Sequence, residues 1–260
     1  MLNLTSGITP AELASALNGK LLFEGTKTIK GAVIDSRAVS DSDLFVAVKG
    51  ENTDGHNYIA SAAKSGAAAV LVEKVGIDIS EVKEHSCSVI LVENTVSALG
   101  IFAKKYKETI PSKTVAVTGS VGKTTTRQFV YSVLSSELNT HKTEGNYNNE
   151  LGLPLTVLKL NESHDAAVFE LGMSAKGEIS YLTDIVRPDI AVITNIGTSH
   201  IEYLGSREGI RDAKLEIAEG LKPDGVLILN GDEPLLENID GAVYVSLKNP
   251  GSDYRATNIC

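Results

Sequence analysis

The length, composition and charge of the chain exclude several classes of protein. Its 260 residues are 42% hydrophobic and 22% charged, an ordinary globular mix, and the formal net charge of −9 has the wrong sign for a general nucleic-acid binder. No apolar run approaches the roughly 18 residues that span a bilayer, and the start lacks a basic cluster, so we expect neither a membrane segment nor a signal peptide. Cys87 and Cys260 lack metal-site spacing, which favours a reducing, cytoplasmic location.

The first half of the chain predicts a small α/β domain. The segment Thr9-Pro10-Ala11-Glu12 has the form of a capping box with proline at the first helical position, and we expect Gly19 to close that helix. A short helix is predicted over 57–65, and a longer one, capped by Asn94, runs to about Glu108 because apolar residues recur at helical spacing. Short β-branched runs predict strands at 31–34, 44–48, 68–72 and 88–92.

A proline-containing linker over 109–113 leads into a second, more regular domain. Its predicted strands are apolar along their length, as the strands of a parallel sheet covered on both faces are. These strands lie at 114–118, 166–170, 189–195 and 225–230, and helices are expected at about 123–138, 177–186 and 207–221. We therefore predict two α/β domains, residues 1–110 and 111–260, the second with a mostly parallel sheet flanked by helices.

The strand over 115–117 leads into a glycine-rich loop that opens a helix, which is the arrangement of a phosphate-binding loop. Its residues are Gly119, Ser120, Val121, Gly122, Lys123, Thr124 and Thr125. Glycines let successive N–H groups point inward, and the helix N-terminus adds partial positive charge. Lys123 is expected to reach the β- and γ-phosphates and the Thr124 hydroxyl to ligate Mg²⁺. Because the chain has no guanine-reading segment, the loop predicts nucleotide chemistry other than that of a GTPase.

Motifs along almost the whole chain resemble those of the Mur ligases, the ATP-dependent amide-forming enzymes of bacterial cell-wall precursor synthesis. The matching segments include 35–37, 43–47, 54–56, the phosphate loop, 145–154, 170–173, 194–197, His200, Lys214-x-Glu216 and 230–232. The resemblance implies a first domain that binds the UDP end of the substrate and a central domain that binds ATP. Complete members have a third, C-terminal domain, and this chain stops before the central domain should end. We therefore expect a truncated chain, without that domain and with little ligase activity of its own.

Three residues of the second domain are candidates for metal binding beside Thr124. Glu170 ends an apolar strand, where an acid suits a Mg²⁺ ligand or a water-positioning base, although it is also explained as a surface acid. Lys214 falls within the apolar stripe of its helix, where a bare cation is costly unless the side chain snorkels to solvent. The resemblance implies that Lys214 is carbamylated by CO₂ and binds a second Mg²⁺, and that His200 is a ligand too. The predicted catalytic residues are Lys123, Lys214 and His200.

Substrate contacts are predicted in two loops. Asn146, Asn148 and Asn149 offer amides in a loop close after the phosphate-loop helix, and we take Asn146 and Asn149 as the candidate substrate contacts. Asp35, Ser36 and Arg37 form a compact polar triplet in the first domain. Each set is equally explained by turn geometry. On the functional interpretation, the asparagines contact substrate or phosphate, and the Arg37 guanidinium contacts the UDP diphosphate.

Within the family, the Asn-rich segment ending in Gly-Leu-Pro points to the member that joins D-alanyl-D-alanine to a UDP-muramoyl-tripeptide. One alternative is a sister ligase that adds an amino acid to a UDP-muramoyl-dipeptide. Another is a non-catalytic fragment that holds a UDP-sugar without turnover. The expected ligands are small molecules: the UDP-muramoyl-peptide, D-alanyl-D-alanine, and ATP with Mg²⁺. The third residue of the tripeptide and the oligomeric state stay open.

Overall fold

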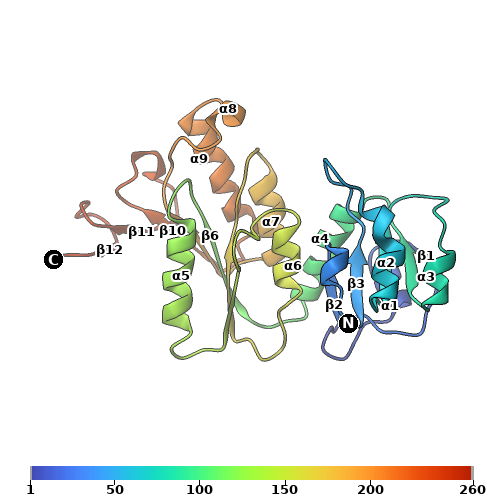
Figure 1. The fold of residues 1–260 in the computed structure, drawn as a ribbon. Coiled ribbons are helices and arrows are strands. Elements are labelled where there is room, and N and C mark those ends of the chain that lie inside the picture. Colours follow the sequence, from blue (N-terminus) through green and yellow to red (C-terminus); the bar gives the residue numbers. More distant parts are fainter. Residues whose placement is uncertain (1, 259–260) are drawn as a thin grey trace. The chain divides into compact units, whose positions relative to one another are not determined.

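The structure, a computed structural model, describes residues 2–258 and divides into two compact units (Figure 1). The first comprises the residues up to Ile110 together with Val157–Asn161, and the second comprises Pro111–Thr156 and the residues from Glu162 onward. Cys260 lies outside the described residues. Within 2–258, no helix is both long enough and apolar enough to cross a membrane. Each unit contains one sheet with helices packed against it, which confirms the predicted α/β fold class.

The first unit has a five-stranded sheet in the order β1-β5-β4-β3-β2. Only β1 is antiparallel to its neighbour, and the other pairs are parallel. The strands are β1 (Lys20–Phe23), β2 (Gly31–Val33), β3 (Asp43–Val46), β4 (Ala69–Val72) and β5 (Ser88–Leu91). The helices are α1 (Pro10–Ala16), α2 (Ile59–Lys64), α3 (Ser80–Glu84) and α4 (Thr95–Lys107), with 3-10 turns at η1 (Ser36–Ala38) and η2 (Gly55–Tyr58).

The capping signals of the first unit are confirmed. The Thr9 hydroxyl accepts the N–H of Glu12 at 3.2 Å, and the Glu12 carboxylate accepts the N–H of Thr9 at 2.9 Å, so both halves of the capping box form. Asn94 caps α4 as predicted. The end of α1 differs from the prediction, because the left-handed residue there is Asn18, with φ 52°, rather than Gly19. Strand β1 has no predicted counterpart, since Lys20–Phe23 contains none of the β-branched residues that marked the predicted strands.

The second unit has a seven-stranded sheet in the order β12-β11-β10-β9-β6-β8-β7, and every described pair is parallel. The strands are β6 (Lys113–Thr118), β7 (Thr140–Lys142), β8 (Ala166–Glu170), β9 (Ile190–Ile193), β10 (Val226–Asn230), β11 (Val243–Ser246) and β12 (Tyr254–Arg255). The helical segments are α5 (Lys123–Leu134), α6 (Gly152–Val157), α7 (Glu178–Val186), α8 (Ile201–Leu204), α9 (Arg207–Leu215), η3 (Glu216–Gly220) and η4 (Pro234–Leu236). The single helix predicted over 207–221 is therefore divided into α9 and η3.

The strand order brings three loops together at the carboxyl end of the second sheet. After β6 the chain passes to the edge as β7, returns as β8 beside β6, and then crosses to the other side of β6 as β9. The loops that follow β6, β8 and β9 therefore meet where the chain reverses its direction across the sheet, which is the usual ligand site of an open α/β sheet. α5 packs on β6 and β8 through Val130, Tyr131 and Leu134, so the loop at its N-terminus is held against the sheet.

Candidate functional site

The phosphate loop joins β6 to α5 through two glycines with positive φ. Gly119 has φ 149° and Gly122 has φ 86°. A Cβ atom on Gly119 would lie 1.9 Å from the Thr194 hydroxyl oxygen, so no larger residue fits there. No side chain caps α5, which leaves the N–H groups of its first turn available to an anion.

The loop that follows β9 braces the phosphate loop from the neighbouring strand. The Thr194 hydroxyl donates to the Val121 carbonyl at 2.6 Å, and the Asn195 side-chain oxygen accepts the Val121 N–H at 2.9 Å. The Ser120 hydroxyl accepts the N–H of Gly197 at 2.8 Å. These contacts within the protein fix the curled backbone, so the loop is preorganised for phosphate.

Glu170, the last residue of β8, is the buried centre of the site. Only 2% of its surface is exposed. One carboxylate oxygen accepts the Thr124 hydroxyl at 3.0 Å and the Arg127 guanidinium at 3.2 Å, and the other accepts the Asn148 amide at 3.0 Å. A buried carboxylate needs such partners to offset the cost of desolvation. The alternative of a surface acid is therefore wrong.

The side chains around Glu170 fit a magnesium ion only in part. The Glu170 carboxylate and the Thr124 hydroxyl are the oxygen donors that Mg²⁺ prefers. Across residues 2–258, however, no group of three His, Cys, Asp or Glu side chains is arranged to hold a metal. An ion beside Thr124 would thus need further ligands, from phosphate oxygens and water as is common for Mg²⁺ in nucleotide sites, or from a modified side chain.

Two lysine ammonium groups lie near each other at this edge of the sheet. Lys123 folds back over the phosphate loop and donates to the Gly119 carbonyl at 2.9 Å. Lys214, near the end of α9, is only 3% exposed, so its side chain does not snorkel to solvent. Its ammonium forms no hydrogen bond or ion pair within the part of the chain that the structure describes. Burial, and to a smaller extent the positive charge of Lys123, lower the pKa of Lys214 to about 8.

Lys214 and Glu216 have different environments although they are two residues apart. The Glu216 carboxylate is buried and accepts the N–H of Gly177 at 2.8 Å and of Ser180 at 3.2 Å, so it caps the N-terminus of α7. The Lys-x-Glu motif therefore anchors α7 through its acid while leaving its lysine beside the phosphate loop. The sequence pattern alone suggested no role for Glu216.

His200 lies after β9, immediately before α8, with a left-handed φ of 62°. The described residues contain no hydrogen bond or ion pair between His200 and either Glu170 or Lys214. Its assignment as a metal ligand stays a prediction.

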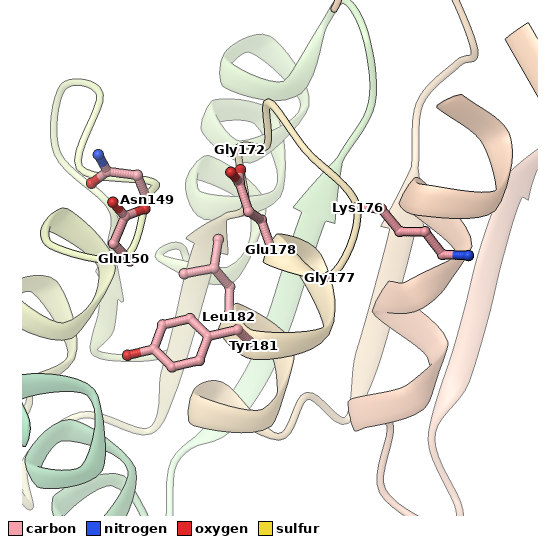
Figure 2. Close-up of a pocket in the computed structure, with 8 residues that line it drawn as sticks. All are labelled: Asn149, Glu150, Gly172, Lys176, Gly177, Glu178, Tyr181 and Leu182. Carbon is pink, nitrogen blue, oxygen red and sulfur yellow. The ribbon is translucent and has the colours of Figure 1, made fainter. Parts of the chain in front are cut away.

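The asparagines of the turn before α6 make different contacts. Asn148 contacts Glu170, whereas the Asn149 side-chain oxygen accepts the N–H of Gly152 at 2.9 Å and caps α6. Asn146 is exposed. Asn149 also lines a cavity of about 300 Å³ between this turn and α7 (Figure 2). The other lining residues are Glu150, Gly172, Lys176, Gly177, Glu178, Tyr181 and Leu182.

The polar triplet of the first unit borders a separate, larger cavity of about 610 Å³. The Asp35 carboxylate accepts the Arg37 N–H at 2.9 Å and pairs with its guanidinium at 2.7 Å, which lowers the pKa of Asp35 to about 2. The Arg37 side chain is 88% exposed, so its guanidinium is accessible to an anion while it pairs with Asp35. The cavity is also lined by Ser36, Ile34, Phe45, Val48, Thr53, Gly55, Tyr58 and Ser61.

Sequence reasoning missed Arg127 in the Glu170 cluster, and it grouped Asn148 with the possible substrate or phosphate contacts rather than with Glu170. Arg127 lies three residues after Thr124 on α5, so helical spacing placed both on one face and could have identified it. Asn148 belongs to the Asn-rich segment, but nothing local distinguishes it from Asn146 and Asn149. Only the fold selects it for Glu170.

Comparisons with known proteins match both units. Residues 28–107 match the family described as "Mur ligase family, catalytic domain", and residues 117–259 match "Mur ligase middle domain". The UDP-N-acetylmuramoyl-tripeptide–D-alanyl-D-alanine ligase of Bacillus subtilis is 48% identical over 233 residues, which cover 88% of this chain and 50% of the relative. The Escherichia coli ligase of the same name is 35% identical over 260 residues, covering 97% and 55%. The chain thus spans about half the length of these relatives.

Solved structures give the same result. A crystal structure of MurF from Acinetobacter baumannii superposes with a TM-score of 0.88 at 36% identity, covering 98% of this chain and 56% of that one. MurF from Thermotoga maritima in complex with ADP superposes with a TM-score of 0.76 at 33% identity, covering 84% and 51%. Since a family description covers more than half of the sequence and the fold agrees throughout, the chain belongs to the Mur ligase family.

Proposed function

We propose that this chain is the UDP-substrate and ATP-binding part of an enzyme that joins D-alanyl-D-alanine to UDP-N-acetylmuramoyl-tripeptide. The enzyme would act in the bacterial cytoplasm, in peptidoglycan precursor synthesis. The observation that carries the proposal is the preformed phosphate loop whose Thr124 is bonded to the buried Glu170. The choice of this member is supported by relatives of that name at 48% and 35% identity.

In the proposed reaction the phosphates of ATP lie on the N–H groups of residues 119–125. Lys123 leaves the Gly119 carbonyl and turns its ammonium to the β- and γ-phosphates. The γ-phosphoryl group passes to the terminal carboxylate of the muramoyl peptide, which yields an acyl phosphate and ADP. The amine of D-alanyl-D-alanine then attacks the carbonyl carbon, forming the amide and releasing phosphate and a proton. The chain contributes positioning and electrostatic stabilisation rather than a nucleophile.

Thr124 and Glu170 are the residues that we propose for Mg²⁺. The ion, when bound, neutralises charge on the transferring phosphoryl group. Arg127 and Asn148 donate to Glu170 and so keep its carboxylate facing the Thr124 hydroxyl. Such outer partners orient a metal ligand and influence its affinity.

A carbamate on Lys214 is the second part of this proposal. A neutral lysine amine attacks CO₂, forms an N–C bond and loses a proton, which leaves an anionic carbamate. Burial favours the neutral amine of Lys214, as its lowered pKa of about 8 indicates. The carbamate would turn repulsion from Lys123 into attraction and add oxygen ligands beside Thr124. We propose His200 as a further ligand on the same edge of the sheet.

The cavity of the first unit is the proposed site for the UDP end of the substrate. Arg37 presents an exposed guanidinium at its border, and a guanidinium binds diphosphate oxygens in a bidentate manner. Asp35 holds that guanidinium, and Ser36 adds a hydroxyl. Asn146 and Asn149 of the second unit are the proposed contacts for the rest of the substrate, with Asn149 at the smaller cavity.

An ADP-release assay on the full-length enzyme carrying this chain tests the proposal. One reaction contains UDP-N-acetylmuramoyl-tripeptide and D-alanyl-D-alanine, and the other contains the UDP-muramoyl-dipeptide and free amino acids. We expect ADP only in the first reaction. ADP in the second reaction alone would identify the sister ligase instead. Binding of a UDP-sugar without turnover in either reaction would support a non-catalytic role.

A further inference from the structure

The loop between β3 and η2 forms part of the first unit's cavity and is tightly folded. Val48, Thr53 and Gly55 all line the cavity. The N–H of Gly55 donates to the Val48 carbonyl at 2.8 Å, and the N–H of Gly50 donates to the Thr53 carbonyl at 2.8 Å. A Cβ atom on Gly55 would lie 2.7 Å from the Val48 nitrogen, so only glycine permits this approach. The shape of the cavity therefore depends on how this loop is held.

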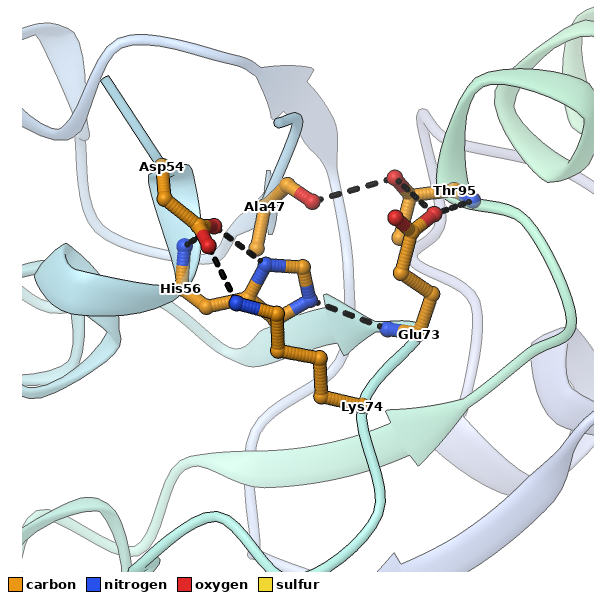
Figure 3. A network of polar contacts seen from close by, with 6 residues as sticks. All are labelled: Ala47, Asp54, His56, Glu73, Lys74 and Thr95. Atoms are coloured by element: carbon orange, nitrogen blue, oxygen red, sulfur yellow. Dashed lines mark hydrogen bonds and ion pairs between the residues drawn. The ribbon is translucent and has the colours of Figure 1, made fainter. Parts of the chain in front are cut away.

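A buried histidine directly follows the loop and has both ring nitrogens occupied (Figure 3). The His56 side chain is 2% exposed. Its Nδ1 lies 2.7 Å from the Asp54 carboxylate, and its Nε2 accepts the backbone N–H of Glu73 at 3.1 Å. A nitrogen that accepts an N–H carries no proton, so the proton of the ring is on Nδ1 and is donated to Asp54. The contacts thus select one tautomer of the neutral imidazole.

The contacts of His56 belong to a chain of polar groups that reaches both ends of the loop. The Glu73 carboxylate accepts the N–H of Thr95 at 2.9 Å, and the Thr95 hydroxyl donates to the Ala47 carbonyl at 3.0 Å. The Thr95 hydroxyl also lies 3.2 Å from the Glu73 carboxylate, but its one proton can go to only one acceptor, and the Ala47 carbonyl is the nearer of the two. The chain Ala47–Thr95–Glu73–His56–Asp54, here called the loop clamp, therefore fastens the residues that flank Val48 and Thr53.

The groups around His56 make Nε2 the ring atom at which protonation would break a contact. Asp54 faces Nδ1 and attracts a positive ring, whereas the Lys74 ammonium pairs with the same carboxylate and opposes one. The Glu73 carboxylate is directed to Thr95, and only its backbone N–H faces Nε2. A proton on Nε2 would face the hydrogen of the Glu73 N–H, so the hydrogen bond between them would be lost. The site is buried, so no water would replace that hydrogen bond.

We propose that His56 is a positioning residue for the UDP-sugar, and that its neutral Nδ1–H form holds the cavity-lining loop in the binding conformation. Protonation of Nε2 breaks the Glu73 contact and releases the loop, so affinity for the sugar nucleotide falls as the pH falls. This inference rests on the proposed function of the cavity. It assigns to the Asp-Gly-His motif a role that neither the motif nor the resemblance specified.

Calorimetry on the 260-residue chain with UDP-N-acetylglucosamine tests the inference at about pH 7.5 and at about pH 5.5. Each phosphate of this probe has one ester bond and one anhydride bond and only a strongly acidic oxygen, so the charge of the probe does not change between the two conditions. We expect the wild type to bind about tenfold more weakly at the lower pH, which corresponds to the loss of one buried hydrogen bond. His56→Asn keeps a donor for Asp54 but offers nothing to Glu73, so we expect it to be about tenfold weaker already at pH 7.5 and nearly independent of pH.

His85→Asn is the matched control, because His85 belongs to the same unit and is exposed at the end of α3. It should bind as the wild type does at both pH values. Thr95→Val and Thr95→Ser test the loop clamp without altering His56. The valine variant loses the hydrogen bond to the Ala47 carbonyl and the serine variant keeps it. Only the valine variant should therefore bind UDP-N-acetylglucosamine more weakly. Wild-type affinity that is equal at the two pH values overturns the role of His56, even if His56→Asn fails to fold. No binding of the probe at either pH contradicts the proposed function of the cavity instead.

Discussion

Replacing Lys214 by methionine is expected to stabilise the chain while destroying the proposed function. The lysine is 3% exposed and unpaired within residues 2–258, and its pKa is lowered from 10.5 to about 8, mainly by burial. That difference corresponds to about 3 kcal/mol against the charged form. Methionine has a similar length and no charge, so it should recover up to this amount at neutral pH.

The sign of the pH dependence follows from the lowered pKa. Below about pH 8 the lysine is protonated in both the folded and the unfolded chain, and the folded chain bears the full cost of burying the cation. Between about 8 and 10.5 the folded chain loses the proton while the unfolded chain keeps it, so wild-type stability rises with pH. The stability difference between Lys214→Met and the wild type should therefore be largest below pH 8 and disappear above 10.5.

Urea unfolding followed by far-ultraviolet circular dichroism, in CO₂-depleted buffer over this pH range, measures the difference. Lys248→Met is the control, since Lys248 is an exposed lysine of the same unit and its replacement should change little. A methionine variant less stable than the wild type, or a difference that does not vary with pH, would refute the reasoning. In the full-length enzyme, Lys214→Ala and Lys214→Arg should both lose most activity, with partial rescue of the alanine variant by acetate. Full activity in the arginine variant would show that Lys214 acts only as a cation.

Two further substitutions test the separation of the sites and the acid sensitivity of the second unit. Lys123→Ala should weaken ATP binding at least tenfold, because charged hydrogen bonds to phosphate contribute about 1.5–3 kcal/mol each. The same variant should bind UDP-N-acetylglucosamine as the wild type does. Calorimetry with each ligand measures both affinities. The Asp232 carboxylate accepts the Ser246 hydroxyl and the N–H groups of residues 247–249, which lower its pKa from 3.8 to about 2. Its contribution to stability is therefore present above pH 3.8 and lost as the pH falls through about 2, and Asp232→Asn should lack that part of the acid titration followed by circular dichroism.

Several elements were predictable because their signals are local. The capping box at Thr9, the cap at Asn94 and the apolar strand that ends at Glu170 appear where the sequence predicts them. β7 and β12 could not be predicted, since Thr140–Lys142 and Tyr254–Arg255 are short and contain no aliphatic residue. Their assignment depends on pairing with β8 and β11, which is information from distant parts of the chain.

The candidate site divides in the same way. The phosphate loop is recognisable from its glycines and its place between a strand and a helix, because the conformation it needs is encoded in consecutive residues. The contacts of Glu170 with Thr124, Arg127 and Asn148 join positions that are 46, 43 and 22 residues apart. They exist because β8 lies beside β6, and no local pattern specifies that order.

By itself the sequence determined the α/β class and the position of the phosphate loop, since hydrophobic period, glycine requirement and cap chemistry all act over a few residues. The Mur ligase resemblance came from the sequence too, through its motifs. Only the tertiary structure decided whether a polar side chain is buried and which groups it contacts. It resolved the surface and snorkelling alternatives for Glu170 and Lys214, and it selected the neutral tautomer of His56 through Asp54 and Glu73. Desolvation and hydrogen-bond partners are properties of the assembled environment, so the chemistry of these groups depends on which strands and loops become neighbours.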